Sequence, residues 1–176
     1  TGESGAEAPL RRSQGDGEPW SGDVVQQCSG ADDEPRGRPS GLPTVRVGTG
    51  YDLHRLVQGR PLVLGGVTIP FELGLAGHSD ADILCHAVTD AILGAASAGD
   101  IGQHFPDTDE RWRGASSIDL LERAAAIVRT RGYRVANVDV TIVAERPKLG
   151  PYRADMVERV AAALGVPPDA VSIKAK

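Results

Sequence analysis

The stretch His78-Ser-Asp-Ala-Asp-Ile-Leu-Cys-His-Ala-Val-Thr-Asp90 is the part of this sequence that decides the fold. Asp82, His86 and Asp90 are spaced four residues apart, so a helix would place all three side chains along one face. The apolar residues of the stretch fall on the other side, where a helix contacts a core. They are Ile83, Leu84, Ala87, Val88, Ala91 and Ile92. The spacing therefore predicts an amphipathic helix whose polar face is a candidate functional site.

The polar face of this helix suits a metal ion. A metal-ligating histidine usually holds its second ring nitrogen with a carboxylate or carbonyl oxygen, and either Asp82 or Asp90 could serve His86 in this way. Asp52 and His54, in the upstream motif Gly50-Tyr-Asp-Leu-His54, add two donors. Three protein ligands with a fourth position open are typical of catalytic zinc. The alternative is a helix with one hydrogen-bonded histidine, solvated aspartates, and a His54 that faces water.

Composition limits the class of protein. A chain of 176 residues allows one domain of ordinary size, and a net charge of −5 argues against a nucleic-acid-binding surface. Cys28 and Cys85 are too few for a disulfide framework, which favours a reducing compartment. No apolar run reaches the roughly 18 residues of a membrane span, and the start has no signal-peptide or transit-peptide pattern. We therefore expect a soluble, cytoplasmic, bacterial protein without membrane or nucleic-acid partners.

Residues 1–44 differ from the remainder of the chain. Gly, Ser, Pro, Glu, Asp and Arg dominate there, and apolar residues such as Trp20 are isolated. Such a segment cannot bury enough apolar surface to offset its ordering entropy. We predict a disordered N-terminal extension over 1–44 and a globular domain over 45–176.

The globular part mixes strand and helix patterns, which predicts the α/β class. Alternation over 45–49 predicts a strand, and two apolar arms around Gly65-Gly66 predict a hairpin over 61–70. The central helix should begin near Ser79 or Asp80 and end near Ser97. A capping box, Ser116-x-x-Asp119, should open a second helix that ends at Gly132, and a third should run from Pro151 to Gly165. Strands are also expected over 135–142 and from Val171.

Further polar residues are candidates for phosphate or cation binding. His78, Ser79 and Lys148 could hold phosphate oxygens by charge and by hydroxyl or N–H donors. The acidic loop 105–109 could hold a divalent cation or be an exposed turn. For any one of these residues, a solvated lysine or a capping serine is the alternative.

Residues 45–176 resemble the 2-C-methyl-D-erythritol 2,4-cyclodiphosphate synthase family, on five motifs that occur in that family's order. The motifs are Gly50-Tyr-Asp-Leu-His54, His78-Ser-Asp-Ala-Asp82 followed by His86, Gly99-Asp-Ile-Gly102, Phe105-Pro-Asp-Thr-Asp109, and Pro147-Lys148. The resemblance implies a mixed β-sheet with about three helices on one face, and sheets that pack together in a homotrimer with active sites between subunits. It also implies that the substrate is a nucleotide diphosphate, the cytidine diphosphate ester of methylerythritol 2-phosphate. The 2-phosphate attacks the β-phosphorus and CMP leaves, in non-mevalonate isoprenoid biosynthesis.

The resemblance assigns roles to residues of this sequence. Zinc is held by Asp52, His54 and His86, a second ion (Mg²⁺ or Mn²⁺) bridges the diphosphate, and His78 stabilises the transition state. Asp100 to Gly102 and the loop 105–109 hold the methylerythritol part, while 144–150 of the adjacent subunit takes the cytidine phosphate end. The substrate-binding residues implied in this way are Asp52, His54, His78, Ser79, Asp100, Ile101, Gly102, Phe105, Pro106, Asp107, Thr108, Asp109, Ala144, Glu145, Arg146, Pro147, Lys148, Leu149 and Gly150.

The family pattern continues beyond Lys176, with a Thr-rich turn, a glutamate and a Gly-Phe-x-Gly-Arg segment. Those residues would complete the last strand and supply a carboxylate to the second metal. We therefore expect zinc binding but weak or lost turnover from this 176-residue chain. The alternative is that the protein itself is longer than this sequence. Two other functions fit the same donors: a zinc-dependent phosphoester hydrolase, and a non-catalytic assembly module held together by metal.

Overall fold

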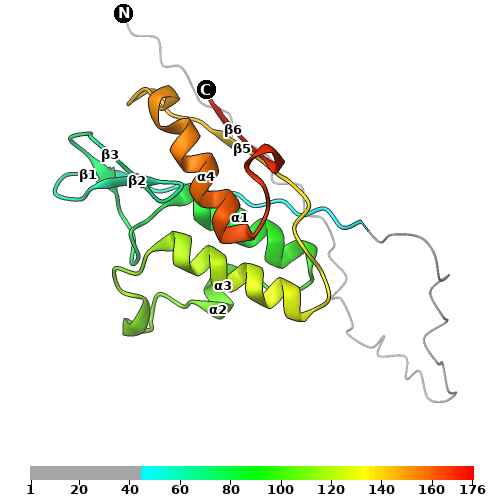
Figure 1. The fold of residues 1–176 in the computed structure, drawn as a ribbon. Helices are drawn as coiled ribbons and strands as arrows, with labels where there is room; N and C mark the ends of the chain where they lie inside the picture. Colours follow the sequence, from blue (N-terminus) through cyan, green and yellow to red (C-terminus); the bar gives the residue numbers. More distant parts are fainter. Residues whose placement is uncertain (1–44) are drawn as a thin grey trace, which may run out of the picture. The chain divides into compact units, whose positions relative to one another are not determined.

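Helix α1 (Ile83–Ala95) is the element on which the described residues, 45–176, are assembled in this computed structural model (Figure 1). It contacts α3 (Ser117–Thr130) and the strands β2 (Leu62–Leu64) and β5 (Val138–Ile142). The predicted amphipathic helix is confirmed, but it begins later than Ser79 or Asp80. The carboxylate of Asp82 accepts the backbone N–H groups of Leu84 and Cys85, and this cap sets the start of the helix.

The structure contains two further α-helices and three single 3₁₀ turns, marked η, in the described residues. They are α2 (Ile101–His104), η1 (Glu110–Trp112), η2 (Gly150–Tyr152), α4 (Arg153–Leu164) and η3 (Pro168–Ala170). Helix α4 packs against α3. It ends at Gly165, which adopts a left-handed conformation (φ 72°), so the predicted stop is confirmed.

The start of α3 differs from the prediction. Ser116 occupies the N-cap position, but its side chain makes no capping hydrogen bond, so the predicted capping box with Asp119 is wrong. The N–H of Ser117 instead donates to Asp80 Oδ2 at 3.0 Å. A carboxylate 37 positions earlier in the chain therefore satisfies one of the free N–H groups of this helix.

The strands form three two-stranded ladders among the described residues. β1 (Leu56–Val57) pairs antiparallel with β4 (Gly74–Leu75), and β2 pairs antiparallel with β3 (Val67–Ile69). β5 pairs parallel with β6 (Val171–Ala175). The predicted hairpin is confirmed, because Leu64 lies opposite Val67 and the two glycines between them have positive φ. The α/β class is confirmed, although the ladders do not join into one sheet here.

The segment before β1 is extended but is not a strand, so the strand predicted over 45–49 is wrong. None of the three ladders of the described chain includes this segment. It runs along α1, and its glycines permit the contact: a Cβ on Gly48 or Gly50 would lie 1.8 Å from the carbonyl oxygen of Ala91 or Ala87. The alternating valines Val45 and Val47 face solvent. The 135–142 strand also begins later than predicted, at Val138.

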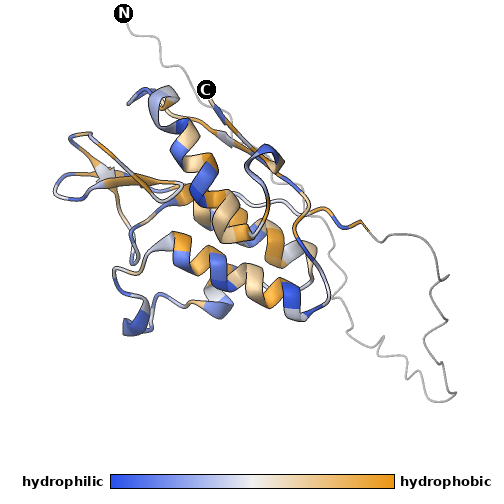
Figure 2. Cartoon of the chain, viewed as in Figure 1, coloured by the Kyte–Doolittle hydropathy of each residue, from blue (hydrophilic) through white to orange (hydrophobic). Residues whose placement is uncertain are grey.

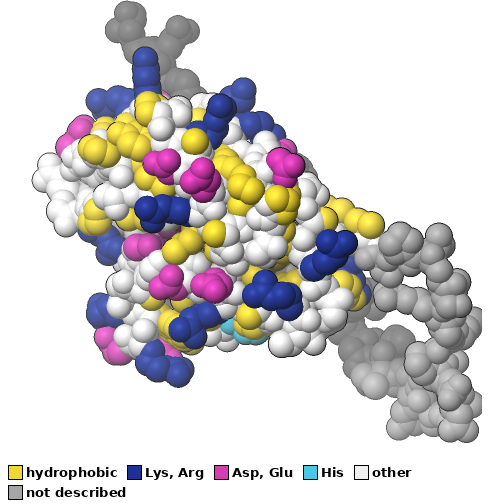
Figure 3. Space-filling model, viewed as in Figure 1, with side chains coloured by type: hydrophobic (Ala, Val, Ile, Leu, Met, Phe, Trp, Pro, Cys, Tyr) yellow, Lys and Arg dark blue, Asp and Glu magenta, His cyan; other side chains and the backbone are white. Residues whose placement is uncertain are grey.

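The core lies where α1, α3, α4 and the hairpin meet. Leu93, Leu121, Met156 and Val160 are completely buried there. Figure 2 shows α1 as largely hydrophobic along its length, whereas α3 and α4 carry hydrophilic patches. On the face drawn in Figure 3, acidic and basic side chains are interspersed over α3 and α4. None of the helices described here has the length and apolar character of a membrane span. The prediction for 1–44, including Cys28, lies outside the described residues.

Candidate metal centre

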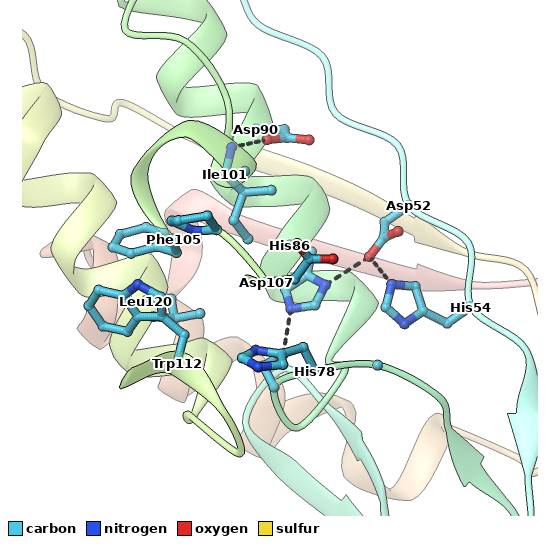
Figure 4. Close-up of a pocket in the computed structure, with 14 residues that line it drawn as sticks. Asp52, His54, His78, His86, Asp90, Ile101, Phe105, Asp107, Trp112 and Leu120 are labelled. Carbon is cyan, nitrogen blue, oxygen red and sulfur yellow. Dashed lines mark hydrogen bonds and ion pairs between the residues drawn. The ribbon is translucent and has the colours of Figure 1, made fainter. Parts of the chain in front are cut away.

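Asp52, His54 and His86 come together into one cluster, as their types and spacing predicted. Asp52 Oδ2 lies 3.1 Å from His54 Nε2 and 2.9 Å from His86 Nδ1 (Figure 4). One ligand atom from each residue lies within 4.8 Å of the others. Asp52 and His54 belong to the extended segment before β1, and His86 belongs to α1. The close packing of Gly50 on α1 therefore brings the two parts of the cluster together, and the three residues could hold a divalent metal ion.

The backbone determines which nitrogen of His54 is available. Its Nδ1 lies 2.5 Å from the carbonyl oxygen of Ala76, which can only accept a hydrogen bond. Nδ1 therefore carries the hydrogen, and Nε2, which faces Asp52, presents a lone pair. Gly77 leaves room for this ring, because a Cβ there would lie 3.1 Å from His54 Nδ1. A bare nitrogen beside a carboxylate oxygen is a suitable pair of ligands for a cation.

The second nitrogen of His86 is held by serines. His86 Nε2 lies 2.9 Å from Ser117 Oγ and 3.1 Å from Ser79 Oγ. The prediction that Asp82 or Asp90 serves this histidine is wrong, because both carboxylates are used elsewhere. Asp82 caps α1 and accepts the N–H of Gly66 at 2.7 Å, whereas Asp90 accepts the N–H of Ile101 at 2.8 Å. Spacing along the helix placed the aspartates correctly but could not show what else they would meet.

Two carboxyl groups near the cluster have pKa values shifted in opposite directions. For Asp52 in the metal-free cluster, burial raises the pKa, but the hydrogen bond with His86 and the charges that His54 and His86 carry when protonated outweigh it, so the pKa is lowered. For Asp82, burial dominates over the N–H donors of Gly66 and Cys85, and the pKa is raised. Asp52 is therefore the carboxyl group that the site keeps in the anionic form a metal ion requires.

A cavity of about 440 Å³ opens beside the cluster. Its polar wall is made by the cluster and by His78, whose buried Nε2 has no hydrogen-bond partner among the described residues. Its apolar wall contains Phe105 and Trp112, whose rings meet edge to face with centroids 5.1 Å apart (Figure 4). The full lining is Asp52, His54, Gly77, His78, Ser79, His86, Asp90, Ile101, Gly102, Phe105, Pro106, Asp107, Trp112 and Leu120. The cavity thus combines polar and apolar surfaces.

Some residues implied by the resemblance do not line this cavity. Asp100 accepts the N–H of Gln103 and caps α2, and Asp109 pairs with Arg111; neither residue lines the cavity, nor does Thr108. Four lining residues were not singled out as binding residues from the sequence: Gly77, Asp90, Trp112 and Leu120. Trp112 and Leu120 had no recognisable signal, because they reach the cavity only through the packing of η1 and α3 beside α1.

The loop 144–150 lines a second cavity, of about 450 Å³. Of its seven residues, all but Arg146 contribute to that wall, and Lys148 is exposed. The two cavities share no lining residue. One chain therefore brings together the metal cluster, His78 and part of the 99–109 region, but it does not bring Lys148 to them.

Comparison with known proteins agrees with the motifs. The model of the YgbB family matches residues 45–176. The 2-C-methyl-D-erythritol 2,4-cyclodiphosphate synthase of Symbiobacterium thermophilum is 62% identical over 129 residues, which are 73% of this chain and 82% of that protein. The synthase of the same name from Laribacter hongkongensis is 59% identical over 132 residues, 75% and 82% of the two chains.

Solved structures show the same likeness. A 2C-methyl-D-erythritol-2,4-cyclodiphosphate synthase solved in a CDP-bound form is 44% identical, with a TM-score of 0.70, over 74% of this chain and 87% of that one. A second structure of a synthase of that name gives a TM-score of 0.71 with the same identity and coverage.

Proposed function

The chain belongs to the YgbB family, and on that premise we propose that it is a 2-C-methyl-D-erythritol 2,4-cyclodiphosphate synthase, a phosphorus–oxygen lyase. The substrate is 4-diphosphocytidyl-2-C-methyl-D-erythritol 2-phosphate. An oxygen of the 2-phosphate attacks the β-phosphorus, the bond from that phosphorus to the oxygen of CMP breaks, and CMP leaves. The product is the 2,4-cyclodiphosphate, a step of non-mevalonate isoprenoid biosynthesis.

The observation that carries this proposal is the donor set at one wall of the first cavity. Two imidazole nitrogens and one carboxylate oxygen, from Asp52, His54 and His86, meet beside an unpaired His78 nitrogen. Nitrogen and oxygen donors from three residues fit zinc with one position open for a phosphate oxygen. When bound, the ion supplies Lewis acidity and orients the phosphate. An intramolecular attack needs orientation and charge stabilisation rather than a protein nucleophile.

His78 is the residue we assign to the charge that develops on phosphorus. Its Nε2 is buried at the cavity wall and has no hydrogen-bond partner in residues 45–176, and its backbone carbonyl accepts the N–H of Gly114 at 2.9 Å, which holds the residue in place. A buried polar atom without a partner is a suitable donor for a phosphate oxygen. Ser79 lines the same wall, although its Oγ already accepts the N–H of Ala81 at 3.1 Å.

The 99–109 region borders the cavity beside the cluster. Ile101, Gly102, Phe105, Pro106 and Asp107 all line the cavity, which supports their predicted role in holding the methylerythritol part of the substrate. A second divalent cation, Mg²⁺ or Mn²⁺, would supply further charge stabilisation to the diphosphate, whose oxygens are the kind of ligand that hard cations prefer.

The division between two cavities supports a homotrimer with active sites between subunits. Since Lys148 lies in a cavity that shares no residue with the metal cluster, residues 144–150 of one subunit could hold the cytidine phosphate end in the site of its neighbour. Native mass spectrometry tests this: we expect a trimer with about one zinc ion per chain, and a metal-free monomer would contradict the proposal.

Product analysis in H₂¹⁸O separates this function from its alternatives. We expect CMP and a cyclic diphosphate without solvent ¹⁸O, since no water enters the reaction. Incorporation of ¹⁸O into a linear phosphate product would instead identify a phosphoester hydrolase. Because turnover of this chain is itself expected to be weak, the assembly module is identified by dissociation of the oligomer with a chelator together with an absence of substrate binding.

A further inference from the structure

Ser117 and Asp80 lie behind the metal-binding side of His86, outside the lining of the cavity. Ser117 is completely buried, and its Oγ donates to Asp80 Oδ1 while its backbone N–H donates to Asp80 Oδ2 at 3.0 Å. The same Oγ lies 2.9 Å from His86 Nε2. Asp80, Ser117 and His86 therefore form a continuous chain of hydrogen bonds that ends at the cluster.

The direction of each hydrogen bond in this chain follows from the donors. An ionised carboxylate can only accept, so the single hydroxyl hydrogen of Ser117 is directed to Asp80. The lone pairs of Ser117 Oγ then face His86, and they require a hydrogen on Nε2. With a hydrogen held on Nε2, Nδ1 is the ring nitrogen left to bind a metal ion, which would displace the hydrogen that Nδ1 shares with Asp52 Oδ2 at 2.9 Å in the metal-free structure.

Ser79 by itself would not make this selection. Its Oγ lies 3.1 Å from His86 Nε2, but its hydroxyl hydrogen could point to Nε2 or to Ser117 Oγ, which is 3.3 Å away. Only the pairing of Ser117 with Asp80 excludes the tautomer in which Nε2 is bare. Asp52 and the ring of His54 also face the His86 ring. The centroids of the two imidazole rings, of His54 and His86, are 5.5 Å apart.

We propose that Ser117 and Asp80 are positioning residues of the metal centre, which hold His86 in the tautomer and orientation that present Nδ1 to the ion. This inference rests on the metal site of the proposed function and deepens it. Partners that orient a metal-ligating histidine typically change metal affinity by about 10- to 100-fold when they are removed. We expect a loss of zinc affinity of that size in Ser117→Ala.

The test is the zinc affinity of the purified full chain, measured by competition with a chromophoric chelator. The variants are Ser117→Ala, Asp80→Asn and the double variant, with Ser116→Ala as matched control, because that neighbouring serine makes no capping hydrogen bond. In Asp80→Asn, the amide oxygen can still accept the hydrogen bond from the backbone N–H of Ser117. The amide N–H₂ group then faces Ser117 Oγ and donates to it. The hydroxyl hydrogen is then driven toward His86 Nε2.

We expect each single variant to bind zinc about 10- to 100-fold more weakly and the double variant to bind no more weakly than the weaker single one, because Asp80 acts through Ser117. Ser116→Ala should match the parent chain. Unchanged affinity in Ser117→Ala, or additive losses in the double variant, would overturn the inference and leave the proposed function intact. A parent chain that binds no zinc would overturn both. If Ser117→Ala does not fold, parent-like affinity in Asp80→Asn overturns the inference by itself.

Discussion

The cavity at Asp52 and the cavity at Lys148 have similar volumes, about 440 and 450 Å³, but their polar side chains are held in different ways. In the first, His54 is held by a backbone carbonyl and His86 by Ser117, so the donors have fixed directions before any ligand arrives. In the second, Glu145 and Lys148 are exposed side chains. The first cavity is preorganised within one chain, whereas the second depends on what binds to it.

This difference predicts unequal effects of mutation. Substitution of a side chain that is held in one orientation in a partly buried site removes a specific geometry, which no neighbouring group can restore. A mobile exposed lysine contributes mainly through its charge, which solvent screens. Changes at the first cavity should therefore remove metal and turnover together, and changes at the second should alter substrate affinity alone.

Removal of a metal ligand should have the largest effect. His86→Ala deletes the Nδ1 donor, and because loss of a partner that only orients a ligand costs about 10- to 100-fold, loss of the ligand itself should lower zinc affinity and turnover by more than about 100-fold. Inductively coupled plasma mass spectrometry and CMP release measure both quantities. His104→Ala is the matched control, since His104 Nε2 meets the carbonyl oxygen of Ala98 at 2.7 Å outside the cluster. Equal zinc loss in both variants would contradict the ligand assignment.

Displacement of the extended segment that carries Asp52 should have the next largest effect. Gly50→Ala places a Cβ 1.8 Å from the carbonyl oxygen of Ala87, so the segment must move away from α1 and carry Asp52 with it. A displacement near 1 Å at a reacting site can cost about 100-fold in rate. We expect a fall in turnover of about 10- to 100-fold.

The control for this variant is Gly94→Ala within α1. Nothing lies within 4 Å of a Cβ at Gly94, and alanine favours the helix by about 0.5–1 kcal/mol. The midpoint of thermal unfolding should rise slightly and turnover should not change. If Gly50→Ala also kept full turnover, the segment would not be fixed by its contact with α1.

A change in the second cavity should have a smaller and more selective effect. Lys148→Ala would remove one proposed charged contact to a phosphate, and because solvent screens an exposed lysine we take the lower end of the about 1.5–3 kcal/mol of a charge-assisted hydrogen bond, so we expect KM to rise by about 10-fold. Bound zinc should stay at the level of the parent chain. Lys174→Ala, which removes a lysine paired with Asp139, is the control and should leave KM unchanged. A loss of zinc in Lys148→Ala would mean that the two cavities are coupled.

The smallest effect should be the acid dependence of stability in the zinc-free protein. The pKa of Asp52 is lowered, so its contribution to the free energy of unfolding is present above the ordinary pKa of aspartate and is lost as the pH falls through the folded-state value. The carboxylate is partly exposed, which limits the contribution to about 1 kcal/mol or less. Urea unfolding at about pH 7 and pH 3 measures it. Asp52→Asn should show a shallower loss between these values, and a steeper loss would contradict the sign.

Sequence patterns predicted the elements whose conformation depends on residues close together in the chain. The 3.6-residue period placed His86 and Asp90 on one face of α1, and Gly65-Gly66 placed the hairpin turn. Pattern reading failed for 45–49. Apolar and polar residues alternate there as in a strand, but a strand also needs a hydrogen-bonded partner from another part of the chain. Pattern reading also failed at Ser116, where a carboxylate remote in sequence supplies the cap.

The sequence by itself determined the candidate metal ligands, because Asp52, His54 and His86 have side chains suited to a cation in motifs that can be read without a structure. Only the tertiary structure decided what holds them. Ser117 is 31 positions from His86, Ala76 is 22 positions from His54, and the glycines that bring Asp52 to α1 act by close approach. The chemistry of a ligand belongs to its side chain, whereas its tautomer and direction depend on neighbours that only packing brings into contact.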